Sequence, residues 1–520
     1  MLHALQYPIR KIFEYLEILF DGPFGPAWNP IRQLGTLAFF FYWVAAVSGI
    51  YVFILFDTSV TGAYESVQQM TNEQWYLGGI MRSLHRYSSD AMVACMIFHL
   101  VREFSTDRYR GARWFAWFTG VPVGWLLFVS GISGYWLVWD ELAQYVAIGS
   151  MEWIDWLGVF GESVASNFLT RGSLDDRFFS LLVFMHIFAP LFLLFVMWIH
   201  VLRVNRAKSN PPKGLAIGSF VMLLVLSLVY PAVSHAPADL GRVPTTLDLD
   251  WYFMALYPLF DIYGPGPLWA LGFGGSLFLC IMPWLPPLKR KPTPEVFLDQ
   301  CNGCTRCFDD CPYSAITMQP RTDGRPFEME AVVNPDMCTS CGICVGSCPM
   351  STPFRRGGAL ETGIDLPDLP LDLVQKNITA AMTEAKKEVA EDQSSLLVLG
   401  CDHGVDISIY SGDGVRPVSL PCIGMLPPSF LDFALAGDKV DGVMLTGCSE
   451  CDCHHRLGLQ WTEDRLAGLR DPYLRKRVPR NRMHAYWAAP SESSRLGDEI
   501  NSFRNRLTDL NTSDKEGSVK

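Results

Sequence analysis

The sequence predicts three structured parts in succession. They are a membrane all-α bundle, a small α+β domain and a parallel α/β domain. Long charge-free runs in the first 290 residues indicate the bundle, since only 18% of all residues are charged and 49% are hydrophobic. Two similar cysteine runs indicate the second part, and apolar runs alternating with helical stretches indicate the third. The predicted boundaries are 1–290, 291–358, a linker and helix at 359–393, 394–510, and a disordered tail at 511–520.

The first 290 residues contain six apolar segments after an interfacial amphipathic helix at residues 1–30. Each segment reaches the about 20 residues that a bilayer crossing requires. Basic residues concentrate after the second, fourth and sixth segments, which places both termini and the later domains in the cytoplasm. The sequence therefore predicts a six-span protein of the inner (cytoplasmic) membrane. The spans are 33–56, 77–104, 114–139, 178–204, 214–234 and 266–288.

Two spans carry histidines in pairs that are fourteen residues apart, His85 with His99 and His186 with His200. Fourteen residues rise about 21 Å and return to nearly the same helix face. Neutral imidazole is a good axial ligand for haem iron, and ionisable residues inside a membrane are usually functional. Two facing helices would thus hold two haems, one above the other. Four unrelated packing histidines would not explain the identical spacing.

Glycines in the first and third spans repeat the same interval. A glycine opposite each haem lets the porphyrin edge approach the backbone. Arg82 and Arg86 in the second span need partners there, and haem propionates are the natural ones. The glycines are Gly35, Gly49, Gly120 and Gly134.

The motif C-x₂-C-x₂-C-x₃-C-P occurs twice between Cys301 and Pro349. Soft thiolates at this spacing are typical of two-cluster bacterial ferredoxins, in which the fourth cysteine of each run binds the other cluster. Disulfides are disfavoured in the cytoplasm, and zinc does not require this doubled run. The predicted 4Fe–4S ligand sets are Cys301, Cys304, Cys307 and Cys348, and Cys338, Cys341, Cys344 and Cys311.

Residues 1–290 resemble cytochrome b of the quinol:cytochrome c reductases and its photosynthetic relatives. The histidine and glycine pairs, Arg82, Arg102 and Ser209-Asn210-Pro211 carry the resemblance. It implies two haems b, with His85 and His186 holding the outer one and His99 and His200 the inner one. It also implies a homodimer, and it places Leu249-Asp250-Trp251-Tyr252 where the family has Pro-Glu-Trp-Tyr at its outer quinol site.

The departures from that family weigh against an intact Q-cycle. Leu249-Asp250 replaces Pro-Glu, Val138-Trp139-Asp140 replaces Pro-Trp-Gly, and Asn205 stands where mitochondrial members have a histidine at the inner quinone site. Asp250 remains able to take a quinol proton, with Tyr252 as the second predicted catalytic residue. The alternatives are an ordinary solvated loop aspartate, and a quinone site near His200 instead.

Four strand-like runs follow residue 394, and several cysteines stand at their ends. Carboxyl ends of parallel strands are where such sheets bind ligands. Cys401, Cys422 and Cys448 lie there, with Cys451 and Cys453 just beyond, which favours a metal site over reduced structural thiols. The runs are Ser395–Gly400, Val415–Leu420, Val440–Thr446 and Met483–Ala488.

This tail resembles the delta subunit of methyl-viologen-reducing hydrogenase, a 2Fe–2S protein. The matching stretches are Pro421-Cys422 to Val443, Gly447-Cys448 with Asp452-Cys453-His454, and Trp487 to Phe503. Where the family has a second cysteine, this chain has Gly404. The resemblance implies a 2Fe–2S cluster and a soluble flavoprotein partner of heterodisulfide-reductase type, and His454 and His455 are not expected to be ligands. The expected ligands are Cys401, Cys422, Cys448 and Cys453, with Cys451 in reserve.

Together these observations predict a membrane electron-transfer subunit that acts as a quinone oxidoreductase. Electrons would pass between the flavoprotein, the 2Fe–2S cluster, two 4Fe–4S clusters, two haems b and quinone. A non-catalytic membrane anchor that relays electrons to another membrane subunit is the alternative. The net charge of −11 argues against nucleic acid as a partner.

Overall fold

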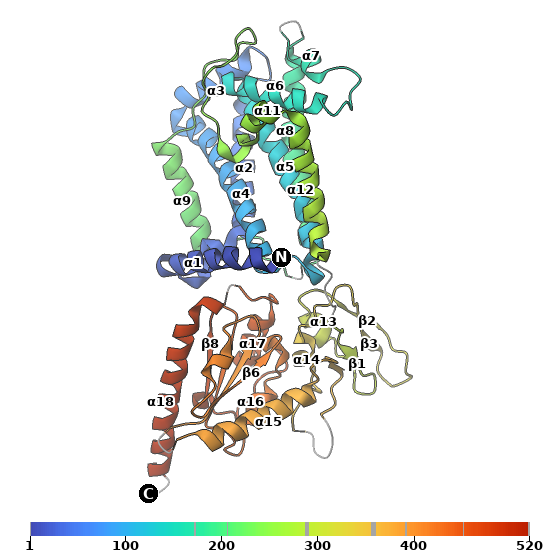
Figure 1. Ribbon diagram of the computed structural model, residues 1–520, viewed down its shortest axis with the longest axis vertical. Coiled ribbons are helices and arrows are strands. Elements are labelled where there is room, and N and C mark those ends of the chain that lie inside the picture. The colour runs from blue at the N-terminus through green and yellow to red at the C-terminus, as the bar shows by residue number, and fades with distance from the viewer. Residues whose placement is uncertain are drawn as a thin grey trace. The chain divides into compact units, whose positions relative to one another are not determined.

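The computed structural model describes residues 2–170, 173–204, 206–285, 291–354, 360–390, 393–450 and 452–517. Asn205 and Cys451 therefore lie outside the described residues. The chain separates into two compact units (Figure 1). The first comprises Met1–Phe13, Trp28–Arg203 and Ala207–Pro287, and the second Glu14–Ala27, Val204–Arg206 and Leu288–Lys520.

The first unit is a bundle of long helices. Helix α2 packs along α4, and α5 packs along α8. The apolar side chains between them form two core clusters, of which one includes Leu37, Phe41 and Leu193 and the other Trp136, Phe178 and Phe179. The long helices are α1 (Leu2–Trp28), α2 (Leu34–Leu55), α4 (Ile80–Ser105), α5 (Trp114–Val138), α8 (Asp176–Val201), α9 (Lys213–Val229) and α12 (Pro265–Ile281).

Short helices connect these long ones, and polar side chains cap several of their ends. Asp175 accepts hydrogen bonds from the backbone N–H groups of Arg177 and Phe178 at the start of α8. Asp250 caps α10 in the same way by accepting from the backbone of Tyr252. The short helices are α3 (Gly62–Asn72), α6 (Glu141–Asp155), α7 (Val164–Phe168), α10 (Trp251–Met254) and α11 (Leu256–Tyr263), with single turns η1 (Pro30–Gln33), η2 (Trp75–Gly79), η3 (Gly111–Arg113) and η4 (Met282–Trp284).

Among the described residues, four helical segments are long and apolar enough to cross a membrane. They are Pro30–Leu55, Trp114–Val138, Asp176–Val201 and Pro265–Trp284. Helix α9 is also apolar but shorter, and α4 carries Arg82, Arg86 and Asp90 among its apolar residues. Four apolar helices support a membrane protein, while the count of six spans and their orientation stay predictions.

The second unit begins with the small α+β domain. Strands β2 (Ile316–Pro320) and β3 (Met329–Val333) form one antiparallel pair, and β1 (Glu295–Val296) and β4 (Ile364–Asp365) form another. The short helices α13 (Arg306–Asp310) and α14 (Ile343–Ser347) each lie inside one cysteine run. Because β4 lies beyond residue 358, the antiparallel pairing ties this later segment back to the start of the domain.

The rest of the second unit is the predicted parallel α/β domain. Its four strands lie in the order β6-β5-β7-β8, and all three pairings are parallel. The strands are β5 (Leu396–Cys401), β6 (Val415–Leu420), β7 (Gly442–Gly447) and β8 (Met483–Trp487). Strands β5 and β7 are buried along their whole length, which explains their uninterrupted apolar sequences.

Helices cover this sheet (Figure 1). Leu496, Ile500, Phe503 and Leu507 of α18 pack into one apolar core with strand residues such as Val398. Helices α15 and α16 contact the strands and each other. The bounds are α15 (Leu371–Glu388), α16 (Ser429–Leu435), α17 (Gly458–Ala467) and α18 (Ser493–Gly517), with turns η5 (Ile407–Tyr410), η6 (Ile423–Met425), η7 (Arg480–Arg482) and η8 (Pro490–Glu492).

The tail predicted to be disordered begins at Asn511, and the structure describes Asn511–Gly517 as the end of α18. Asn511 itself is anchored: its amide nitrogen lies 3.0 Å from Ser394 Oγ, and its amide oxygen lies 2.9 Å from Arg482 Nη1. These side-chain bonds to distant segments hold the last turns in place. Residues 518–520 lie outside the described residues.

Candidate redox centres

The four predicted glycines each face one of the four predicted histidines. A Cβ atom at Gly49 would lie 2.8 Å from His85 Cε1, and one at Gly134 would lie 2.9 Å from His186 Cε1. The corresponding distance is 3.4 Å both for Gly35 to His99 and for Gly120 to His200. In the bundle, α2 therefore packs against the histidines of α4, and α5 against those of α8. These contacts occur at two levels along the helices, one with His85 and His186 and the other with His99 and His200.

His85 and His186 form one level of this arrangement. Their ring centroids lie 6.1 Å apart with an interplanar angle of 76°. His85 Nδ1 lies 2.8 Å from the Ala45 carbonyl oxygen, and His186 Nδ1 lies 3.0 Å from that of Ser130. A proton on Nδ1 satisfies each carbonyl and leaves Nε2 as the metal-binding nitrogen. This donor set fits one bis-histidine haem.

His99 and His200 form the other level. Gly35 faces His99 and Gly120 faces His200, and Thr119 Oγ1 lies 3.1 Å from His200 Nδ1. The buried Arg102 lies beside Glu103, with 3.9 Å between its Nη1 and Glu103 Oε1. Arg82 bonds to Thr71 Oγ1 and, at 2.8 Å, to Ser234 Oγ. These contacts hold both predicted haem-pocket arginines in place.

Asp250 lies in a compact polar cluster and is not solvated, since its side chain is only 5% exposed. The backbone N–H of Tyr252 donates to its Oδ1 at 2.7 Å. Its Oδ2 accepts a hydrogen bond from the Tyr135 hydroxyl and lies 3.2 Å from Arg86 Nη2. Arg86 Nε lies 3.5 Å from Asp90 Oδ2, so one guanidinium bridges two carboxylates.

In this cluster Arg86 pairs with Asp90 and Asp250, whereas the sequence predicted haem propionates as its partners. Arg86 and Asp90 stand four apart on α4, a spacing that places them on one helix face and is readable in the sequence. The contribution of Tyr135 from α5 has no such local signal. Tyr252 takes part through its backbone, while its ring stacks on that of Trp251 with the centroids 4.0 Å apart.

The departure at Val138-Trp139-Asp140 has a local structural role. Trp139 ends α5 in the left-handed conformation with φ of 52°. Asp140 then caps α6, accepting from the backbone of Ala143 at 2.8 Å and from that of His235 at 2.9 Å. The carboxylate at this position thus joins two helices and a distant loop of the first unit.

In the ferredoxin region the eight cysteines line two separate cavities. Neutral thiols are expected there until a metal binds, since burial raises the pKa of Cys307 and of Cys341 to about 12. Each cavity combines three cysteines of one run with the fourth of the other, which fits the ligand pattern of two cubane clusters. One is lined by Cys301, Cys304, Cys307 and Cys348, the other by Cys311, Cys338, Cys341 and Cys344.

Four more cysteines gather at the carboxyl edge of the parallel sheet. Cys401 Sγ lies 3.5 Å from Cys448 Sγ, and this contact and burial raise the pKa of Cys448 to about 12. Cys453 interacts with Cys448, and Cys422 with both. Four convergent thiols suit an iron–sulfur cluster. At Gly404 a Cβ would lie 2.8 Å from the Gly447 backbone, so the missing family cysteine has no room there.

Three histidines, His403, His454 and His455, lie beside this cysteine group with their ring nitrogens within 4.8 Å of one another. Sequence reasoning missed His403, which has no motif of its own. The rings of His403 and His454 stack at 3.6 Å and 11°. In parallel stacked imidazole rings the nitrogen lone pairs point in parallel directions. The ring nitrogens of His403 and His454 therefore do not converge on a single metal ion. His455 Nδ1 lies 3.1 Å from the Tyr313 hydroxyl.

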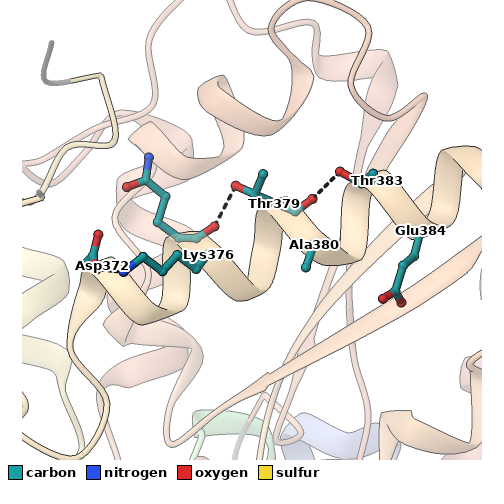
Figure 2. A pocket seen from close by; sticks show the side chains of 7 residues that line it. Asp372, Lys376, Thr379, Ala380, Thr383 and Glu384 are labelled. Carbon is teal, nitrogen blue, oxygen red and sulfur yellow. Dashed lines mark hydrogen bonds and ion pairs between the residues drawn. The ribbon is translucent and has the colours of Figure 1, made fainter. Parts of the chain in front are cut away.

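A surface hollow along α15 contains none of the predicted site residues (Figure 2). Some of its polar side chains bond within the helix: Lys376 pairs with Asp372 at 2.6 Å, and Thr379 donates to the carbonyl of Gln375 at 2.8 Å. Others bond to neighbouring segments, Gln375 to the Pro353 carbonyl and Glu384 to Arg416. We assign this hollow no function.

Comparison with known families finds three matches along the chain. Residues 21–208 match the family described as cytochrome b/b6/petB, residues 300–352 a 4Fe–4S dicluster domain, and residues 395–511 the delta subunit of methyl-viologen-reducing hydrogenase. The three matches follow the predicted order of the parts. A cytochrome b domain implies haem b, and a dicluster domain implies iron–sulfur clusters.

Individual relatives match the N-terminal part. Cytochrome b6 of Porphyra purpurea is 30% identical over 194 residues, which are 36% of this chain and 87% of that protein. Cytochrome b of Rhodospirillum rubrum is 23% identical over 296 residues, covering 51% of this chain and 72% of the relative. A chain of a hyperthermophilic respiratory Complex III matches 50% of this chain and 77% of its own length, at 18% identity and a TM-score of 0.42.

The histidine pairs agree with the family match over residues 21–208 and with the cytochrome b relatives. The cysteine sites agree with the two family matches in the second unit. The chain belongs to the cytochrome b family through its N-terminal part, which here precedes a 4Fe–4S dicluster domain and a hydrogenase delta-subunit-like domain in one membrane electron-transfer subunit.

Proposed function

We propose that this protein links a soluble flavoprotein complex of heterodisulfide-reductase type to the quinone pool. Electrons pass through one 2Fe–2S cluster, two 4Fe–4S clusters and two haems b. The observation that carries the proposal is that one chain groups its donors into five sets: two histidine pairs and three sets of four cysteines. These five sets match the five proposed carriers one to one, so the described residues supply ligands for each carrier between a soluble partner and the membrane.

The ligands follow from these groups. His85 and His186 hold one haem, and His99 and His200 hold the other. Each four-cysteine cavity holds one 4Fe–4S cluster, and the cysteines at the sheet edge hold the 2Fe–2S cluster. Haems and clusters, when bound, supply one-electron chemistry. The protein's own residues orient His85, His186 and His200 through their Nδ1 contacts, as for Ala45 with His85. At the sheet edge, burial excludes water from Cys401, Cys422 and Cys448.

Asp250 is the proposed proton-binding group for quinone. Its carboxylate is buried beside the Tyr135 hydroxyl and the Arg86 guanidinium, and a buried acid at hydrogen-bond distance from donors can exchange a proton with a quinol hydroxyl. Asp90 also pairs with Arg86, its side chain interacts with that of Asp250, and its buried carboxylate oxygen Oδ1 makes no geometric hydrogen bond. That oxygen is a second place for a quinol proton. Tyr252 orients Asp250 through its backbone N–H.

The proposed location is the inner membrane, with six spans and with both termini and the iron–sulfur domains in the cytoplasm. Helices α4 and α9 supply the two spans beyond the four apolar segments. The cytochrome b family resemblance favours a homodimer. Soluble partners would then meet the cysteine-bearing domains in the cytoplasm.

One observation favours the alternative, a non-catalytic anchor that relays electrons to another membrane subunit. Both carboxylate oxygens of Asp250 already have protein partners, Tyr252 on one side and Tyr135 with Arg86 on the other. An acid satisfied in this way stabilises the loop without any quinone. The two functions differ in whether the purified protein reacts with quinol.

The test is anaerobic addition of a menaquinol or ubiquinol analogue to purified protein, following the haem α bands and the iron–sulfur EPR signals. We expect haem reduction, then cluster reduction. Asp250→Asn should slow haem reduction by about 10²-fold or more, the usual contribution of a general base. The matched control is Asp248→Asn, an exposed carboxylate in the same loop. Haems that only dithionite reduces would support the anchor.

A further inference from the structure

The ferredoxin and parallel-sheet domains of the second unit touch through two short helical turns that carry cysteines at their starts. Helix α14 follows Cys341 and includes Cys344, while turn η6 follows Cys422. The two turns are in contact. A Cβ atom at Gly346 of α14 would overlap the Gly424 carbonyl oxygen of η6. The backbones therefore meet directly, with no side chain between them.

The sulfur of Cys422 lies at this contact. A Cβ atom at Gly458 would overlap Cys422 Sγ and would also lie 3.3 Å from Cδ1 of Ile343, the residue before Cys344. Ile343 also lines the cavity of Cys311, Cys338, Cys341 and Cys344. Ile343 does not line the cavity of Cys301, Cys304, Cys307 and Cys348.

A buried ion pair fastens the same contact. Arg465 of α17 places Nη2 at 2.6 Å from Asp310 Oδ2 and 2.7 Å from Ser347 Oγ, and its Nη1 donates to the Gly424 carbonyl at 2.9 Å. The side chains of Asp310 and Arg465 are 3% and 1% exposed. Arg465 thus binds α13, α14 and η6 at once, from both domains.

Two further groups complete the shell around Asp310. Arg470 Nε lies 2.6 Å from Asp310 Oδ1, and the indole N–H of Trp461 donates to the Asp310 carbonyl at 3.1 Å. The guanidinium of Arg470 lies 3.6 Å from the centroid of the Trp461 ring. Because Asp310 ends α13 and stands directly before Cys311, this shell also fixes the position of Cys311, a proposed ligand of the cluster with Cys338, Cys341 and Cys344.

We propose that electrons cross between the parallel-sheet domain and the ferredoxin domain through the cluster of Cys311, Cys338, Cys341 and Cys344, at the Cys422 contact, and that Asp310 and Arg465 are the positioning residues of this crossing. The inference rests on the proposed clusters. The rate of electron tunnelling falls exponentially with the distance between clusters. The contact between α14 and η6 therefore makes this 4Fe–4S cluster the expected electron-transfer partner of the 2Fe–2S cluster. The cluster of Cys301, Cys304, Cys307 and Cys348 then stands next along the path.

Magnetic coupling between reduced clusters tests the order. Cys341→Ser and the matched Cys304→Ser each remove a ligand from one 4Fe–4S cluster in the full-length protein. Iron analysis and EPR first establish which clusters assemble. In dithionite-reduced protein we expect a 2Fe–2S signal broadened by its neighbour. Cys341→Ser should abolish the broadening and Cys304→Ser should retain it; the reverse result would overturn the proposal.

The positioning residues need a variant that keeps every cluster. Arg465→Gln breaks the pair across the domains, whereas the control Arg477→Gln breaks a pair with Asp432 inside one domain. We expect Arg465→Gln to lose the magnetic broadening at unchanged iron content, Arg465→Lys to restore part of it, and Arg477→Gln to keep it.

The outcomes separate this inference from the proposed function. Broadening that survives in Arg465→Gln would show that the ion pair does not position the crossing. Full broadening in Cys341→Ser, with the other cluster intact, would place the crossing elsewhere while leaving the carriers in place. Iron analysis without a 2Fe–2S cluster would contradict the proposed function itself, and the crossing with it.

Discussion

At the residue scale, the glycines of the membrane bundle differ in how closely they approach their histidines. The Cβ distances at Gly49 and Gly134 are 2.8 and 2.9 Å, below any normal contact, while those at Gly35 and Gly120 are 3.4 Å. If a methyl group is added at Gly49 or Gly134, the imidazole of His85 or His186 must therefore move. At Gly35 or Gly120, the imidazole of His99 or His200 needs only a small shift. The two haem sites should respond differently to the same substitution.

We predict that Gly49→Ala displaces His85 and lowers the content, or shifts the α band, of one haem. Overpacking of this kind costs about 1–3 kcal/mol. Gly35→Ala should have a smaller effect. The control is Gly124→Ala on α5, where a Cβ would meet nothing within 4 Å. Haem-to-protein ratios and low-temperature spectra measure the result, and equal losses in Gly49→Ala and Gly124→Ala would contradict it.

Asp441 gives a pH prediction in the soluble part. Burial alone would raise its pKa, but hydrogen bonds from the Ser395 hydroxyl and backbone N–H, with the Lys386 ammonium at 3.0 Å, hold the pKa below its usual value. A lowered carboxyl pKa stabilises the fold above the unfolded-state value, and this stability is lost as the pH falls from about 5 through the folded-state pKa.

Asp441→Asn should therefore lower the free energy of unfolding by about 1–2 kcal/mol near neutral pH. The difference from the unmodified protein should shrink as the pH falls through the lowered folded-state pKa of Asp441, below which both proteins carry a neutral side chain at this position. Hydrogen exchange of the β5 amides at several pH values measures it. A difference that stays constant from pH 7 down to pH 3 would exclude the ionised carboxylate as its source.

At the element scale, the loop after β5 passes so close to the end of β7 that it leaves no room for a cysteine side chain at position 404. Gly404 lies against the Gly447 backbone, next to Cys448 at the end of β7. A side chain of any kind at this position must displace one of the two strand ends. The chain thus departs from the hydrogenase delta-subunit pattern where its own packing leaves no space for a thiol.

We predict that Gly404→Cys and Gly404→Ala lower the yield of the 2Fe–2S cluster by similar amounts, because the clash comes from the Cβ atom that both share. Iron and sulfide analysis with EPR g-values of the two variants makes the comparison. If Gly404→Cys alone gave a higher cluster yield or new g-values, the added thiol would be acting as a ligand after all.

At the scale of the whole molecule, the position of the quinone site decides how the membrane potential acts on turnover. An electron that crosses the membrane field gains or loses up to about 2.3 kcal/mol per 100 mV. With quinone at Asp250 and the iron–sulfur domains in their proposed cytoplasmic position, electrons from the clusters would cross both haem levels. With quinone near His200, transfer is almost electroneutral.

We therefore expect turnover in proteoliposomes to change with an imposed potential, and to change in opposite directions when the sign of the potential is reversed. Asp250→Asn should remove this voltage-dependent component, while Asp248→Asn should preserve it. A turnover rate indifferent to voltage in the unmodified protein would assign the quinone site to the cytoplasmic side.

The sequence alone determined the parts that depend on local spacing. A fourteen-residue interval places histidines and glycines on single helix faces, and the doubled cysteine run specifies a dicluster domain. Apolar runs that end in cysteines predicted the parallel α/β domain, which the strand pairings confirm. Each of these patterns lies within a short stretch of the sequence, so it can be recognised without knowing the tertiary structure.

Only the tertiary structure decided the contacts between distant segments. Tyr135 reaches Asp250 across 115 residues, and Arg465 reaches Asp310 across 155. Neither pair has a periodic signal, because each depends on how whole elements pack. The end of α18 beyond Asn511 has the same origin, since its polar sequence reads as disorder and its bonds to Ser394 and Arg482 come from the fold. Residue spacing in the sequence thus identified the haem-ligand and cluster-ligand motifs. The packing of helices and strands decided which residues from distant segments come into contact.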